Sequence, residues 1–195
     1  METSVDSTFP RLMLAHAKQR PEAAALREKE YGIWQTLSWR ALAALVERLA
    51  GGLAAAGLQP GQHVVVIGDN RPRLYAAMLA AQSLGGIAVP LYQDAVGAEF
   101  VFPITNAEVA FAIAEDQEQV DKLVEIRPQC PTLAHIWFDD PRGLRHYSEP
   151  GLASVDALLF AGDAHAKSHS GFFAAAVAAT QADDVAAMFF TSGTT

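Results

Sequence analysis

The stretch Val64-Val65-Val66-Ile67-Gly68-Asp69-Asn70 decides the fold class of this 195-residue chain. Its apolar part is a continuous β-branched run without polar alternation, which is typical of a strand buried on both faces of a parallel sheet. A helical pattern follows over about 71–84 and ends at Gly85-Gly86, before a short strand, Ile87-Ala88-Val89, that Pro90 closes. A strand, a helix and a strand within about 30 residues predict a right-handed βαβ unit.

The same alternation continues along the rest of the chain. Further apolar runs that suit strands lie at 109–114, 133–138 and 185–190, and helical patterns lie at 98–105, 116–126, 155–160 and 172–179. A polar loop with Pro and Gly separates two of these elements at 139–151. Strands alternating with helices predict an α/β fold with a mostly parallel sheet and helices on both faces.

The first 57 residues add helices and a hairpin to this plan. A helix is expected over 9–19, and two strands, 23–27 and 33–37, form a hairpin with Tyr31-Gly32 near its turn. Ser38 suits the N-cap of a helix whose apolar residues recur at three and four positions up to Leu53, and Gly57 ends it.

Composition limits the function classes. Apolar residues make up 51% and charged residues 18% of the chain, compared with about 25% charged in a typical domain, so we expect an ordered, core-rich chain. The net charge of -8 argues against broad binding of nucleic acid or anionic membranes. Cys130 is the single cysteine, which excludes an intrachain disulfide and a multi-cysteine zinc site and favours a cytoplasmic protein. We expect neither a secretory signal nor a membrane span.

The last five residues are Thr191, Ser192, Gly193, Thr194 and Thr195, directly after the expected strand at 185–190. Hydroxyl groups and backbone N–H groups beside a glycine can wrap an oxyanion, and ligands of open α/β sheets collect at the carboxyl ends of strands. A loose tail is the alternative, and a chance Ser-Gly-Thr-Thr has odds of roughly 1 in 200 in a chain of this length. We expect a truncated chain whose loop continues.

Phe189-Phe190-Thr191-Ser192-Gly193-Thr194-Thr195 resembles the start of the phosphate-binding loop of the adenylate-forming (AMP-binding) superfamily. Upstream, 64–70 and 85–92 resemble the early strand and the Gly-x-x-x-Val-Pro-Leu segment of that family, in the same order. The segments 28–34, 92–94 and 115–123 look most like the long-chain fatty acyl-CoA synthetase branch. On this resemblance, 1–195 is the N-terminal portion of the large adenylate-forming domain, truncated inside the phosphate-binding loop and without the C-terminal domain.

The resemblance implies a two-step ligase reaction for the full-length protein. A fatty acid carboxylate attacks the α-phosphate of ATP, with Mg²⁺ as the metal partner, and coenzyme A then displaces AMP. The residues Thr191, Ser192, Gly193, Thr194 and Thr195 would belong to the loop that holds the ATP phosphates. The adenine, ribose and catalytic lysine sites of the family lie downstream, so no catalytic or metal-binding residue is assigned here and the isolated chain is expected to be inactive.

Several alternatives stay open. The protein could instead be another acid-CoA ligase or an amino-acid adenylation domain, because the residues that set acyl specificity lie mostly outside this chain. A non-catalytic α/β module that binds a small ligand or a partner is the alternative from another class. No nucleic-acid partner is expected, whereas peripheral membrane association, oligomeric state and acyl chain length are left open. Motifs of dinucleotide, Walker-type and α/β-hydrolase sites do not occur in the sequence.

Other candidate residues receive structural interpretations. Asn70 is expected to cap the following helix, and the acidic stretch 115–123 is expected to be a solvated helix start. His165 and His169 have helical metal-site spacing, but their Gly- and Ser-flanked segment predicts no helix and therefore no metal. The predicted surface or capped histidines are His16, His63, His135 and His146, and the predicted core tryptophans are Trp34, Trp39 and Trp137. Asp183-Asp184 is expected to be a solvated turn.

Overall fold

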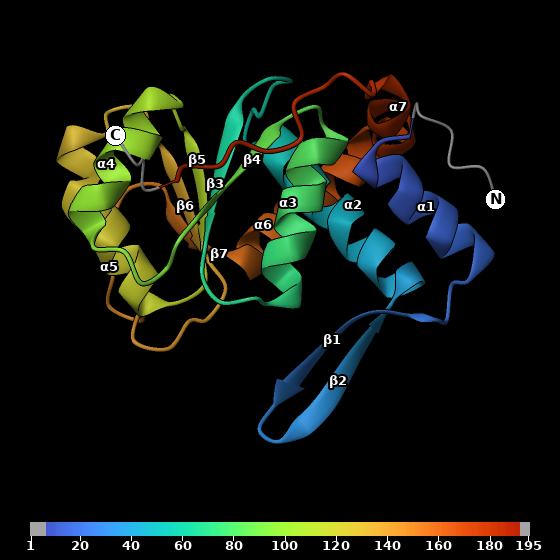
Figure 1. Ribbon diagram of the computed structural model, residues 1–195, viewed down its shortest axis with the longest axis horizontal. Coiled ribbons are helices and arrows are strands. Elements are labelled where there is room, and N and C mark those ends of the chain that lie inside the picture. The colour runs from blue at the N-terminus through green and yellow to red at the C-terminus, as the bar shows by residue number, and fades with distance from the viewer. Residues whose placement is uncertain (1–6, 192–195) are drawn as a thin grey trace.

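The computed structural model describes residues 7–191, which form one parallel sheet with helices on both of its faces and a separate hairpin (Figure 1). The sheet has the strand order β4-β3-β5-β6-β7, and every neighbouring pair of strands is parallel. Its strands are β3 (His63–Ile67), β4 (Ile87–Leu91), β5 (Phe111–Ala114), β6 (His135–Phe138) and β7 (Leu152–Ser154). The predicted α/β class and the βαβ unit are therefore confirmed.

Two hydrophobic clusters lie on opposite faces of the sheet. Val64 and Val66 point into one cluster, and Val65 and Ile67 point into the other, which explains why this strand has no polar alternation. The first cluster includes residues of α1 (Phe9–Gln19), α2 (Trp39–Ala55), α3 (Pro72–Ser83), α6 (Val155–Ser168) and α7 (Phe172–Ala179). The second includes residues of α4 (Gly97–Asn106) and α5 (Gln117–Ile126), which a short 3₁₀ turn, η1 (Arg127–Gln129), follows.

Local signals in the sequence account for these helices. The Ser38 hydroxyl accepts a hydrogen bond from the Ala41 N–H at 3.3 Å and begins α2, and Gly57, with a φ of 95°, follows its end. Glu118 and Lys122 form the predicted ion pair on α5 at 2.8 Å. Pro103 lies inside α4, which nevertheless continues from Gly97 to Asn106.

The hairpin of β1 (Ala24–Glu30) and β2 (Ile33–Ser38) projects from the body of the molecule (Figure 1). Its turn residues, Tyr31 and Gly32, have φ values of 47° and 81°, as a two-residue turn with both central φ values positive requires. Because the hairpin projects, Trp34 is 65% exposed, and its predicted core position is wrong. Trp137 lies in the sheet and is buried, as predicted.

Helices α2 and α6 cross at glycines, which bring their backbones into contact. A Cβ atom at Gly162 would lie 1.9 Å from the Arg48 carbonyl oxygen, so only glycine fits there. Arg48 also donates to Asp163 through Nε and Nη2, both at 2.7 Å. The helix predicted over 155–160 is longer than expected, because α6 continues to Ser168.

The expected strand at 185–190 is wrong. Within the described residues this segment forms a single parallel bridge, between Ala88 and Ala187, on the outer edge of β4. Alternate residues of β4 face the segment, so Pro90 would be the next donor after Ala88, and proline has no N–H. The pairing therefore ends after one step, and Phe189 remains 70% exposed.

Three of the histidines predicted to be at the surface or capped are half-buried. The ring of His135 lies beside those of Phe111 and Trp137, with centroids 5.5 and 5.3 Å away, and the ring of His16 lies 4.6 Å from that of Trp39. Nε2 of His63 is buried. Neighbouring side chains therefore cover part of each ring. No helix in the described range 7–191 has the length and apolar character to cross a membrane.

Candidate functional site

A cleft lies at the carboxyl edge of the sheet, where β3 and β5 are neighbours. The chain leaves β3 for α3 on one face of the sheet and leaves β5 for α5 on the other, so this edge contains a topological switch point. Ligands of open α/β sheets bind at such points. The cleft has a volume of about 800 Å³ and is lined by polar residues after β3, β4, β5 and β6, and by residues of the hairpin.

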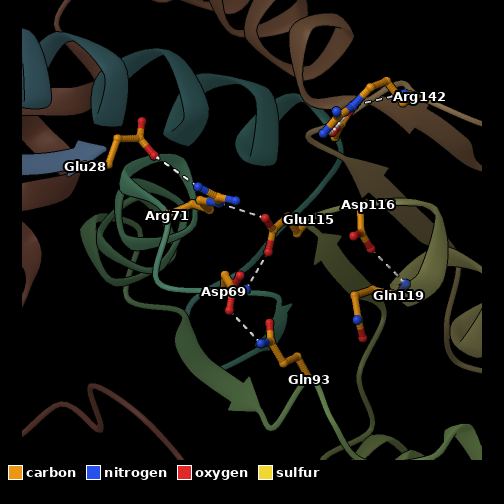
Figure 2. Close-up of polar contacts among 9 residues, drawn as sticks. Glu28, Asp69, Arg71, Gln93, Glu115, Asp116, Gln119 and Arg142 are labelled. Carbon is orange, nitrogen blue, oxygen red and sulfur yellow. Dashed lines mark hydrogen bonds and ion pairs between the residues drawn. The ribbon is translucent and has the colours of Figure 1, made fainter. Parts of the chain in front are cut away.

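Glu115 holds two loops of this cleft together (Figure 2). One of its carboxylate oxygens accepts the Asp69 backbone N–H at 2.5 Å, and the other accepts Nε–H of Arg71 at 2.8 Å. Gly68 has a φ of 153°, and a Cβ atom there would lie 2.4 Å from that of Glu115, so the close approach needs glycine. The Glu115 side chain is 14% exposed, and the prediction that it belongs to a solvated helix start is wrong.

Sequence reasoning missed Glu115 although a signal was present. A carboxylate directly after a strand buried on both faces lies at the carboxyl edge of the sheet, where few positions are fully solvated. The rest of the prediction for this segment holds, because the Asp116 side chain caps α5 and accepts the Gln119 N–H at 3.2 Å.

Asn70 does not cap α3. Its side-chain oxygen accepts the hydroxyl of Tyr75 at 2.7 Å, and the N-cap position belongs to Arg71, whose side chain makes no capping hydrogen bond. Arg71 precedes Pro72, and a residue before proline is held in extended backbone, so the helix begins one residue later than the cap prediction requires. Figure 2 shows that the Arg71 guanidinium instead lies between Glu115 and Glu28 of the hairpin, 3.7 Å from the latter.

The charge of the cleft is acidic. Nine carboxylate side chains and four basic ones line it, and three of the basic ones are arginines paired with carboxylates. Arg73 donates a hydrogen bond to Asp139 at 2.7 Å, but burial has the larger effect and raises the pKa of Asp139. The hydrogen bond from Arg142 lowers the pKa of Asp140. A triphosphate would meet net repulsion here, so the cleft does not suit the ATP phosphates.

The predicted phosphate-binding residues begin where the described part of the chain ends, at Thr191. Thr191 is exposed and does not line the cleft, and Ser192, Gly193, Thr194 and Thr195 lie outside the described residues. The segment before them passes from β4 to α4 (Figure 1), where Phe190 packs edge-to-face on Phe102 at 5.9 Å between ring centroids. The prediction for these five residues therefore stays a prediction.

Other sequence candidates lie outside this cleft. Asp184 accepts the Gln181 N–H at 2.7 Å in an exposed turn, as expected for Asp183-Asp184. Within residues 7–191, no group of three or more His, Cys, Asp or Glu side chains could hold a metal ion. His165 and His169 stack on one another at the end of α6, so the prediction that their segment is not helical is wrong.

A doubly wound parallel sheet with a cleft at its switch point is typical of ligand-binding α/β proteins. Within this class, the chain belongs to the adenylate-forming, or AMP-binding enzyme, family, whose model matches residues 13–195. The resemblance of the sequence to this family is thereby confirmed.

Its relatives include fatty acid ligases. The chain is 31% identical over 191 residues to the medium/long-chain-fatty-acid–[acyl-carrier-protein] ligase FadD10 of Mycobacterium tuberculosis, an alignment that covers 97% of this chain and 31% of the relative. It is 40% identical over 87 residues to the fatty acid–[acyl-carrier-protein] ligase MmaC of Mycobacterium marinum, covering 45% of this chain and 16% of the relative. The chain thus spans about a third of FadD10.

Solved structures show the same fold. Acetoacetyl-CoA synthetase from Streptomyces lividans superposes with a TM-score of 0.70 and 23% identity, covering 79% of this chain and 25% of that protein. A long-chain-fatty-acid CoA ligase from Rhodopseudomonas palustris superposes with a TM-score of 0.67 and 21% identity, covering 78% and 36%.

Proposed function

We propose that this chain is the N-terminal portion of a cytoplasmic, ATP-dependent fatty acyl ligase, with long-chain acids as its substrates. The observation that carries the proposal is the family match over 13–195, which extends to the hydroxyl-rich segment Thr191–Thr195. Relatives named as fatty acid ligases support the acyl substrate.

The proposed reaction has two displacements. The fatty acid carboxylate attacks the α-phosphate of ATP, forming an acyl–adenylate and releasing pyrophosphate. A thiolate then attacks the acyl carbonyl and AMP leaves, so that a thioester forms. The thiol belongs to coenzyme A or to a carrier protein, because relatives of both kinds are named.

The first displacement brings two anions together, so it needs alignment and charge neutralisation. Mg²⁺, when bound with ATP, supplies positive charge on the phosphate oxygens. From this chain, the hydroxyls of Thr191, Ser192, Thr194 and Thr195 would donate to phosphate oxygens. Gly193 would let the backbone approach them. These residue types fit the group, whereas the acidic cleft at the switch point does not.

The experiment measures ATP–pyrophosphate exchange by the complete product of the gene, with acids from acetate to stearate. Exchange with long-chain acids, followed by thioester formation with coenzyme A or a carrier protein, supports the proposal. No exchange with any acid contradicts it, and exchange limited to short acids contradicts the long-chain substrate. The 195-residue chain alone is expected to give no thioester, because it spans about a third of the fatty acid ligase FadD10.

A further inference from the structure

The end of α6 brings two imidazole rings together. His165 lies in the last turn of the helix, and His169 is its C-cap residue, four positions later. Their rings are stacked, with centroids 4.2 Å apart and planes 15° apart. His165 is half-buried and His169 is exposed, so solvent reaches the pair. In a helix, histidines four positions apart can bind one zinc ion together. Here His165 is helical, and His169 is the residue at which the helix ends, with a non-helical backbone.

Hydrogen bonding prepares His169 to act as a ligand. Its Nδ1 lies 3.2 Å from the His165 carbonyl oxygen and 3.0 Å from the Ser168 hydroxyl. A carbonyl only accepts, so Nδ1 carries the proton and donates it, and the lone pair of Nε2 stays available. Such a hydrogen bond fixes the tautomer and orientation of metal-bound histidines in general.

His165 is held from its other side. Phe172 of α7 packs edge-on against its ring, with centroids 4.8 Å apart. This burial, with the neighbouring His169, also lowers the pKa of His165, which favours the neutral imidazole that binds metals.

We propose that His165 and His169 form a surface site for a divalent transition metal such as Zn²⁺, Ni²⁺ or Cu²⁺, with water completing the coordination. Two imidazole nitrogens on a tetrahedral zinc lie about 3.3 Å apart, so the stacked rings must rotate about their side-chain bonds until one nitrogen of each points at the ion. Within the described residues no third His, Cys, Asp or Glu completes the group. Mg²⁺ and Ca²⁺ require oxygen ligands, so they do not bind here.

The charges around the pair set its pH dependence. Lys167 lies between the two histidines in sequence, and Asp163, two positions before His165, is held by Arg48 of α2. From α7, the contacting group is the uncharged ring of Phe172. Protons compete with the metal for the imidazole nitrogens, so binding should weaken at acidic pH.

The test is calorimetric titration of the untagged 195-residue chain with zinc chloride at pH 7.5 and at pH 5.5, with melting temperatures in parallel. We expect one zinc ion per chain at the higher pH, a zinc-dependent rise in melting temperature, and both lost at the lower pH. The variants His165→Asn and His169→Asn should each weaken binding by about tenfold or more. His146→Asn, in the exposed loop after β6, is the matched control and should bind like the wild type.

The outcomes decide the proposal in either direction. Melting temperatures without metal show whether a variant still folds, and a folded His169→Asn chain with wild-type zinc affinity would overturn the site. Equal loss in the His146→Asn control, or no binding of Zn²⁺, Ni²⁺ or Cu²⁺ by the wild type, would overturn it as well. Binding of Ni²⁺ or Cu²⁺ but not of Zn²⁺ by the wild type would support the site and identify which metal of the proposed class it prefers.

Discussion

The carboxylate of Glu115 lies 2.8 Å from Nε of Arg71 and so joins the carboxyl ends of β5 and β3 across the switch point of the sheet. The two residues are 44 positions apart in sequence. Their contact also ties the hairpin to the body, because Arg71 reaches Glu28 as well. Glu115 thus links the loops after two strands of the sheet and, through Arg71, the hairpin.

Replacing Glu115 should destabilise the chain. The Glu115→Gln variant keeps the shape but loses the charge, which weakens the hydrogen bonds to Arg71 and the Asp69 N–H; we expect a loss of about 1–3 kcal/mol. Urea unfolding measures it. Glu125→Gln, an exposed carboxylate of α5, is the matched control and should change stability by less than about 0.5 kcal/mol. Equal effects of both variants would show that Glu115 has no special role.

The close crossing of α2 and α6 leaves no room for a side chain at Gly162, so a substitution there should destabilise the chain. A methyl group there meets the backbone carbonyl of Arg48, which cannot move without shifting the helix, so Gly162→Ala should cost about 1–3 kcal/mol or more. Gly97→Ala is the milder comparison, because its Cβ would lie 3.3 Å from the Lys122 carbonyl oxygen, a tight contact that a shift of a few tenths of an ångström relieves. Thermal unfolding of both variants measures the difference, and a stable Gly162→Ala chain would contradict the close crossing.

The hairpin turn offers a stabilising substitution. Tyr31 adopts a φ of 47°, which is unfavourable for an aromatic residue, whereas asparagine tolerates it and Asn-Gly is a preferred pair for this turn. Tyr31→Asn should therefore stabilise the hairpin by about 0.5–1 kcal/mol. Amide hydrogen exchange of β1 and β2 measures the local effect. Slower exchange is expected, and faster exchange would mean that the exposed tyrosine ring stabilises the turn.

Asp139 and Asp163 should respond to pH in opposite directions. Burial raises the pKa of Asp139 above its unfolded value, so protonation favours the folded chain. The hydrogen bonds from Arg48 lower the pKa of Asp163, so its contribution is present above the unfolded pKa of about 3.9 and is lost as the pH falls through the folded value.

Urea unfolding between pH 7 and pH 3 checks this contrast. The unfolding free energy of the wild type minus that of Asp139→Asn should rise as the pH falls towards about 4. The same difference for Asp163→Asn should stay constant down to about pH 4 and fall only below it. Parallel curves for the two variants would contradict the assigned environments.

The phosphate-binding proposal predicts a selective effect on ATP. In the complete gene product, Ser192→Ala and Thr194→Ala should each raise the KM for ATP by about 10–100-fold, because each removes a hydrogen bond to an anionic oxygen. The KM for the fatty acid should change little. Ser170→Ala, an exposed hydroxyl beyond α6, is the control. Unchanged KM values for ATP would remove these residues from the site.

Much of the local structure was predictable because its causes are local. The β-branched run at 64–67 predicts a strand buried on both faces, and Ser38 and Gly57 mark the limits of α2. These signals act within a few residues, through backbone sterics and capping. The wrong predictions involve contacts between distant segments: 185–190 fails to form a strand because of Pro90, and Trp34 is exposed because its hairpin projects.

The sequence by itself determined the fold class, the family and where most of the helices begin, since periodicity, caps and motif order are all properties of the chain. Only the tertiary structure decided that Glu115, Arg71 and Glu28 meet at one edge of the sheet, and that His165 stacks on His169. The reason is physical: the spacing of residues along a chain fixes local backbone conformation. Which side chains become neighbours depends instead on strand order and helix length, which the packing of the whole chain sets.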